Sequence, residues 1–342
     1  MAMTSSSDAP GAQHPTASAE GAAPPVGGSR RRLLTQLVKI VGFVIAIVAV
    51  GLCVRILVRE WPTVSAALRH ANLWLLLLAL LLGGIGMWLL AVLWWRCLAV
   101  FGVRRGVAEV SSWYFAGELG KYLPGGIWTV VGRGELARRA GVSRSTAYAT
   151  TLFSLALMCV GGGVACGLLV PFFALDGGRF GPELMLIALV PIGIVVVHPA
   201  VFGRLLALAK RVTKGRLDLT APRWSAMLGL IALATPTWLA VGAASSVITA
   251  ALGFEQQPAR VAFAAVVAWI VGFLAVPVPA GAGIRELLFI VACGMAIGPA
   301  TAVAGVARVF LIVVDAVGGI AGLLTVRWAG RRRPAEIGQL ET

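Results

Sequence analysis

Long apolar runs with few polar interruptions recur along this chain of 342 residues. A helix needs about 20 mostly apolar residues to cross the hydrocarbon core of a bilayer. Six runs have that length, and we predict full membrane spans at roughly 36–58, 72–95, 146–171, 183–202, 224–251 and 300–326. The pattern therefore predicts an all-α fold, a polytopic bundle of transmembrane helices.

Two further segments do not match a simple span. Residues 106–140 are amphipathic, and residues 260–297 form two apolar halves interrupted at 277–283. Pro and Gly stand at both interruptions, where they free backbone groups that are costly to expose in lipid. We therefore predict two broken or re-entrant helical hairpins. The sequence leaves open whether 260–297 is a hairpin or two short spans, so the total is six to eight spans.

The distribution of Arg and Lys predicts the orientation, because basic loops stay on the cytoplasmic side. Arg104 and Arg105 precede the first hairpin, and Arg138 and Arg139 follow it. Residues 204–223 form another basic loop, so both termini are expected in the cytoplasm. The first hairpin then dips in from the cytoplasm and the second from outside. Opposed broken helices in the two halves indicate an inverted repeat of the transporter type.

Composition indicates where the domains begin and end and which class of protein this is. Hydrophobic residues make up 59% of the chain and charged residues 13%, which excludes an ordinary soluble domain. Residues 1–29 are rich in Ala, Ser, Gly and Pro and predict a disordered cytoplasmic tail. Residues 30–328 form the transmembrane domain, and 329–342 a basic cytoplasmic tail. We expect a multi-pass protein of the plasma (inner) membrane.

The net charge of +15 does not indicate nucleic-acid binding, because most of the excess lies in short loops and tails. The sequence contains no metal-ligand spacing, no P-loop, no dinucleotide fingerprint and no set of nucleophile and base. We therefore expect no cofactor, no metal and no enzymatic activity. The oligomeric state is not predicted.

The first break carries a set of polar candidates. Lys121 and Tyr122 stand just before Pro124-Gly125-Gly126, and Arg133 and Glu135 follow about one turn later. Unwound glycine backbone and a nearby Lys could bind an anionic head group such as a phosphate. The alternatives are an interfacial loop with Lys121 reaching to the surface, and local pairing of Arg133 and Glu135 that only fixes the hairpin.

The second break carries the strongest candidates. Pro279, Gly281 and Gly283 come directly before Arg285 and Glu286. A Glu at a helix N-terminus is favoured by the helix dipole, whereas an Arg there is not. An Arg at membrane depth needs an anionic partner, which is either a protein group or the substrate. A structural salt bridge is the alternative to a binding site.

Two charges interrupt the last predicted span. Arg308 and Asp315 are seven residues apart and so share a helix face. We predict an ion pair from Glu286 to Arg308, with Asp315 lying deeper. The sequence leaves open whether these charges serve structural pairing or coupling to a substrate or proton.

At these residues the chain resembles the lysylphosphatidylglycerol synthase transmembrane-region family, also called flippase-like membrane proteins. The resemblance rests on Gly-Lys-Tyr-Leu-Pro-Gly-Gly-Ile-Trp at 120–128, on Arg-Ala-Gly-Val-Ser at 139–143 and on Pro-Val-Pro-Ala-Gly-Ala-Gly-Ile-Arg-Glu at 277–286. It covers about residues 33–328, and Arg308 matches an Arg often present in the last helix of the family. Ala280 departs from the pattern, since a Gly is usual there. A second departure is at 152–155, where family members often carry an acidic residue or an Arg.

The resemblance implies a protein that handles membrane lipids. In the aminoacyl-lipid synthases this domain is associated with moving the modified phospholipid between leaflets. Our first hypothesis is therefore translocation of an anionic phospholipid or a lipid-linked head group. The alternative is a non-catalytic membrane partner that presents a lipid carrier to a separate glycosyl- or aminoacyl-transferase. The expected partners are a membrane lipid and such a transferase, and not nucleic acid. An enzyme acting alone on a polyprenyl-phosphate carrier is disfavoured, because no paired carboxylates or metal ligands are present.

Overall fold

The computed structural model describes residues 47–48, 50–123, 127–174, 191, 195, 198–212, 220–275 and 279–340. The chain divides into two compact units, residues 1–38 and 39–342, and all described residues belong to the second. Every described secondary-structure element is helical. An all-α polytopic bundle is therefore confirmed.

Four described helices are long and apolar enough to cross a membrane. They are α3 (Leu73–Val100), α6 (Arg144–Ala174), α9 (Trp224–Ala251) and α12 (Ile297–Leu340). Each coincides with a predicted span. The predicted span 36–58 is helical over 50–58, and most of its earlier part lies outside the described residues. Most of the predicted span 183–202 also lies outside them.

Both predicted hairpins are present as pairs of short helices joined by a break. The first consists of α4 (Val107–Glu118), the 3₁₀ turn η1 (Leu119–Tyr122) and α5 (Trp128–Arg139). The second consists of α10 (Pro258–Leu274), the 3₁₀ turn η3 (Pro279–Gly281) and α11 (Ile284–Ala292). The segment 260–297 thus folds as two short helices that turn back on each other at the break.

Hydrogen bonds close the base of each hairpin. Nη2 of Arg105 donates to the carbonyl of Ala140, at 2.5 Å, where α4 begins and α5 ends. Nε of Arg260 donates to the carbonyl of Ala292, at 3.5 Å, where α10 begins and α11 ends. Each broken segment therefore returns to the end of the bundle from which it started.

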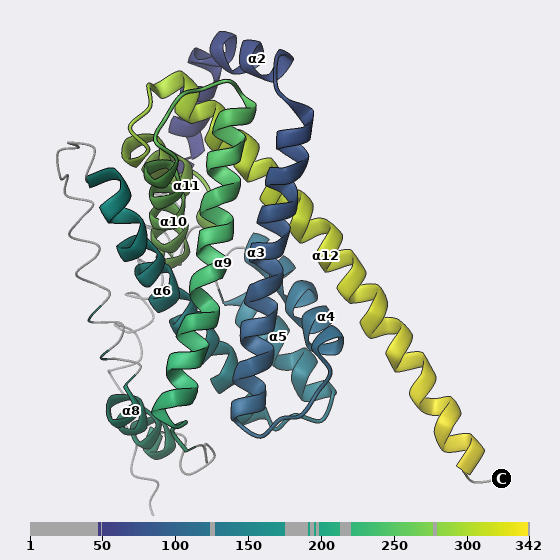
Figure 1. The fold of residues 1–342 in the computed structure, drawn as a ribbon. Helices are drawn as coiled ribbons and strands as arrows, with labels where there is room; N and C mark the ends of the chain where they lie inside the picture. The colour runs from purple at the N-terminus through teal and green to yellow at the C-terminus, as the bar shows by residue number, and fades with distance from the viewer. Residues whose placement is uncertain are drawn as a thin grey trace, which may run out of the picture. The chain divides into compact units, whose positions relative to one another are not determined.

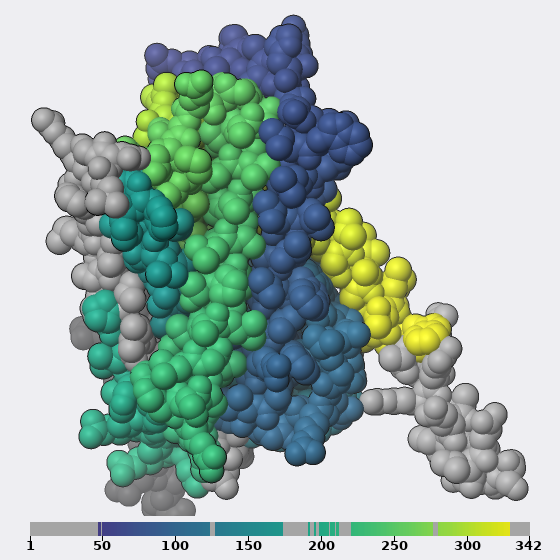
Figure 2. Space-filling view, viewed as in Figure 1, coloured from purple at the N-terminus to yellow at the C-terminus, as the bar shows by residue number. Residues whose placement is uncertain are grey.

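The long helices run in directions that make the two halves opposed. The backbone N–H of Asn72, the residue before α3, donates to the carbonyl of Ala251, the last residue of α9, at 2.8 Å. Because α3 and α9 also pack along their length, they are antiparallel (Figures 1 and 2). The hairpin α4–α5 follows α3 at one end, and α10–α11 follows α9 at the other (Figure 1). A long helix, a hairpin and a second long helix thus occur twice in opposite directions, as in an inverted repeat.

Two shorter helices were not expected. α2 (Trp61–Arg69) occupies a predicted loop, and α8 (Pro199–Val212) occupies the end of the predicted fourth span and the basic loop after it. The predicted connection between spans is therefore helical over 204–212. Apolar and basic residues there alternate at helical spacing, and Pro199 at the first turn favours helix initiation.

Candidate functional site

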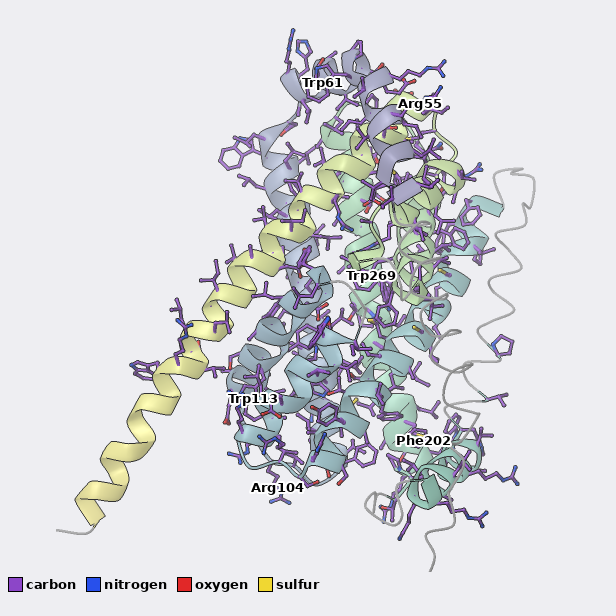
Figure 3. The ribbon with its side chains drawn as sticks, turned by 180° about the vertical axis from the view of Figure 1, so that it is seen from behind. Arg55, Trp61, Arg104, Trp113, Phe202 and Trp269 are labelled. Atoms are coloured by element: carbon purple, nitrogen blue, oxygen red, sulfur yellow. The ribbon has the colours of Figure 1, made fainter. Side chains whose placement is uncertain are left out.

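The tips of the two hairpins meet inside the bundle. The turn η1 contacts both η3 and α12. Side chains from both hairpins line one pocket between them, with a cavity volume of about 100 Å³. Trp269 of α10 lines this pocket and lies about midway between Trp61 and Arg104, which mark opposite ends of the bundle (Figure 3). The two breaks thus form a single site deep within the bundle.

A buried ion pair links the two helices of the first hairpin. The guanidinium of Arg133 on α5 binds the carboxylate of Glu118 on α4, and both residues are almost fully buried. The Arg133 guanidinium also lies over the ring of Tyr114, 3.7 Å from its centroid. A buried charge is costly unless it is paired, so this arrangement neutralises both groups within the protein.

Asp315 holds the first tip against the last helix. Its Oδ2 lies 2.7 Å from Nζ of Lys121 and accepts a 2.6 Å hydrogen bond from the hydroxyl of Tyr122. Nζ of Lys121 also lies 3.3 Å from the Glu118 carboxylate. Lys121 therefore bridges two carboxylates, one on its own hairpin and one on α12.

The second tip turns through left-handed backbone. Gly281 and Gly283 have φ values of 64° and 83°, which glycine adopts without steric cost. Ala280 has a φ of 49°, and among the described residues it is the single non-glycine in this region. The carboxylate of Glu286 accepts a 2.7 Å hydrogen bond from the N–H of Gly283, which caps α11.

Arg308 of α12 binds this second tip. Its Nη1 donates to the carbonyl of Ala280 at 3.0 Å and lies 3.5 Å from Oε1 of Glu286. The predicted ion pair between Glu286 and Arg308 is confirmed. Helix α12 thus holds both tips, the first through Asp315 and the second through Arg308.

Arg285 differs from Lys121, Arg133 and Arg308 because no described carboxylate forms an ion pair with it. Its stem passes Gly272, where an added Cβ would lie 2.9 Å from Arg285 Cδ. Its guanidinium lies over the ring of Trp269, 4.2 Å from the centroid. Nη2 of Arg285 and Nε1 of Trp269 are buried, and neither has a hydrogen-bond partner among the described residues. Two buried N–H donors at the site therefore lack an acceptor among the described residues.

Arg285 and Trp269 also separate two pockets. The pocket between the tips is lined on its polar side by Glu118, Lys121 and Arg133. A second pocket, of about 80 Å³, is also lined by Arg285 and Trp269, and apolar residues of α3, α9, α10 and α12 form most of its wall. A ligand bound at Arg285 can extend toward two pockets with mainly apolar walls, of which the one between the tips also carries Glu118, Lys121 and Arg133.

The lysylphosphatidylglycerol synthase TM region family matches residues 39–322, which include both hairpins, α3, α6 and α9, and α12 up to residue 322. The chain belongs to this family. A search of curated proteins finds no match to the chain. Membership confirms the resemblance noted in the sequence and makes the chain a multi-pass membrane protein.

The structure brings most of the predicted candidates together. These are Lys121, Tyr122, Arg133, Gly281, Gly283, Arg285, Glu286, Arg308 and Asp315. Pro124, Gly125 and Gly126 lie outside the described residues. Pro279 begins η3, and its side chain is likewise outside them.

Glu135 does not join this set. Its carboxylate pairs with the exposed guanidinium groups of Arg138, at 2.8 Å, and Arg139, at 3.1 Å. It lies outside the four membrane-spanning helices, and hydrogen bonds from Arg138 and then Arg139 lower its pKa to about 2. This local pairing is the alternative that the sequence had left open for Glu135.

Two residues of the site were not among the predicted candidates. Glu118 was visible as a charge beside the first break, and a carboxylate there could have been matched to Arg133 across the hairpin. Trp269 lies in an apolar run, where an aromatic residue gives no signal that separates a binding surface from ordinary packing.

Proposed function

We propose that this family member translocates an anionic phospholipid or a lipid-linked head group between leaflets, with the head-group phosphate bound at Arg285. The observation that carries the proposal is that the guanidinium of Arg285, at the point where the two hairpins meet, has no ion-pair partner among the described residues. The role is non-enzymatic: the protein supplies a path for the lipid and makes or breaks no covalent bond.

An unpaired charge is most costly deep in the membrane. A charged side chain near the bilayer centre costs about 3 kcal/mol on insertion scales, so it needs a partner. Lys121, Arg133 and Arg308 have carboxylate partners in the protein. Arg285 has an aromatic face and no described carboxylate partner, so the phosphate of a lipid would supply the missing charge.

The opposed hairpins support translocation rather than binding at one surface. One hairpin extends from each end of the bundle, and α12 is bound to both tips (Figure 1). A small movement of one tip relative to the other would open the site toward one leaflet at a time, as proposed for inverted repeats generally. The proposal places the protein in the plasma membrane with the Arg-rich base of the first hairpin in the cytoplasm.

The test is a translocation assay in proteoliposomes. Purified protein is reconstituted with a trace of fluorescent phosphatidylglycerol, and a membrane-impermeant reductant quenches the label in the outer leaflet. Protein-containing vesicles should lose the inner-leaflet fluorescence as well, whereas protein-free vesicles should retain it. Retention of that fluorescence in both, together with co-purification of a lipid-dependent transferase, would instead favour the role of a non-catalytic partner.

A further inference from the structure

We infer that the site selects lipids whose phosphate is a diester with a single negative charge, a substrate class narrower than anionic lipid in general. The inference rests on the proposed function, because it names the substrate class of the same site. It follows from two independent observations, the balance of charges around the tips and the position of Arg285 between two pockets.

The described charges of the site nearly cancel. Three carboxylates surround the two tips, and each pairs with a cation. The cations are one Lys and three Arg, and Arg285 is left over. The pairs are Glu118 with Arg133, Asp315 with Lys121, and Glu286 with Arg308.

The excess of one positive charge matches a ligand with one negative charge. In a site of low dielectric, a second uncompensated charge of either sign is strongly disfavoured. A zwitterionic head group brings its own cation to a site that is already positive. A dianionic phosphate leaves one negative charge without a partner.

The two pockets on either side of Arg285 favour a diester over a monoester. A phosphodiester carries a substituent on each side of the phosphorus. With its phosphate at Arg285, the polar head group can occupy the pocket lined by Glu118 and Lys121. The glycerol and its acyl chains can then extend toward the other pocket, whose wall includes Ala79, Ala244 and Ala304. A phosphomonoester has one substituent and would leave one pocket without a ligand group.

The geometry of Arg285 fits a phosphate in particular. A guanidinium presents planar N–H donors that match two phosphate oxygens. Nη2 of Arg285 and Nε1 of Trp269 are both without described partners and belong to residues in contact with each other.

The experiment compares three acyl-labelled lipids that differ in charge and esterification. Phosphatidylglycerol is a monoanionic diester, phosphatidylcholine is a zwitterionic diester, and phosphatidic acid at alkaline pH is a monoester approaching two charges. Translocation rates are measured separately for each lipid, and binding to the purified protein is measured by native mass spectrometry. We expect phosphatidylglycerol to exceed both others by about tenfold, which corresponds to about 1.4 kcal/mol.

Charge-shift variants test the balance directly. Asp315→Asn raises the net charge of the site by one and should move the preference toward phosphatidic acid. The double variant Lys121→Gln/Asp315→Asn restores the original net charge and should restore the preference for phosphatidylglycerol. Lys121→Gln alone lowers the net charge of the site by one and should move the preference toward phosphatidylcholine. This variant replaces Asp315→Asn in the experiment if Asp315→Asn does not fold.

The outcomes separate this inference from the proposed function. Equal rates and equal binding for the three lipids would overturn the charge selection and leave translocation intact. Selective binding without translocation would support the charge selection and overturn translocation. Preferences that do not follow the net charge across the variants would contradict the inference even if phosphatidylglycerol is preferred by the wild type.

Discussion

Nζ of Lys121 in the first hairpin lies 2.7 Å from Oδ2 of Asp315 in the last long helix. The pair joins the two halves of the chain at membrane depth. The Asp315 side chain is only 1% exposed, and the same oxygen accepts the Tyr122 hydroxyl. This contact holds the first tip in position beside Arg308, which binds the second.

Removal of the Asp315 charge should destabilise the protein. Asp315→Asn leaves Lys121 with the more distant Glu118 carboxylate, at 3.3 Å. Loss of one partner from a buried pair typically costs about 3 kcal/mol. We expect a clear drop in the thermal unfolding temperature in detergent. The double variant Lys121→Gln/Asp315→Asn should lose less than the sum of the two single variants, which a double-mutant cycle measures.

Glu135→Gln is the matched control for this experiment. It removes a carboxylate that forms ion pairs with two arginines but lies at an exposed position. Exposed pairs contribute about 0–1 kcal/mol, so the unfolding temperature should change little. An effect of Glu135→Gln as large as that of Asp315→Asn would contradict the assignment of the Lys121 pair as a buried contact between halves.

The close approach of α4 and α5 depends on Gly117. A Cβ added there would lie 2.7 Å from Arg133 Cγ and 2.8 Å from the Arg133 backbone nitrogen. Gly117→Ala should therefore displace Arg133 from Glu118 and lower the free energy of unfolding by about 1–3 kcal/mol.

Gly167→Ala in α6 is the control, because nothing lies within 4 Å of its added Cβ. Helix propensity alone should make that control neutral or more stable by up to about 1 kcal/mol. Equal stability of the two variants, measured by thermal unfolding, would show that α4 and α5 are less closely packed than described.

The left-handed conformation of Ala280 predicts a stabilising substitution. Ala280 has a φ of 49°, a region that costs an L-residue roughly 1–2 kcal/mol and costs glycine little. Ala280→Gly should therefore raise the free energy of unfolding by about 1 kcal/mol, because the gain in the folded state exceeds the added freedom of the unfolded chain. Ala282 is not in the left-handed region, so Ala282→Gly should lower stability by about 0.5 kcal/mol. A destabilised Ala280→Gly protein would contradict the strained turn.

The hairpins could be predicted from the sequence because membrane insertion imposes simple rules. Breaks at Pro and Gly mark where a helix cannot continue, and basic residues at 104–105 and 138–139 fix both ends of the first hairpin on one side. Helices α2 and α8 could not be predicted in this way. They are short and amphipathic or weakly apolar, so they produce no hydropathy signal of their own.

Part of the site could also be predicted. The pair of Glu286 with Arg308 followed from two charges in apolar surroundings, each of which needed a partner. The partners of Asp315 did not follow, because hydropathy does not give the depth at which η1 ends. The sequence also did not predict that Arg285 has no described carboxylate partner, because ion pairing depends on how α10, α11 and α12 meet. The role of Trp269 depends on the same packing.

The most direct test of the central claim is the translocation rate of labelled phosphatidylglycerol in Arg285→Ala vesicles. Arg138→Ala is the matched control, because Arg138 is exposed and pairs with Glu135 away from the pockets. We predict that Arg285→Ala slows translocation by about tenfold or more, equivalent to at least about 1.4 kcal/mol, whereas Arg138→Ala keeps the wild-type rate. Translocation by Arg285→Ala at the wild-type rate, in protein that unfolds at the wild-type temperature, would contradict the assignment of the phosphate to Arg285.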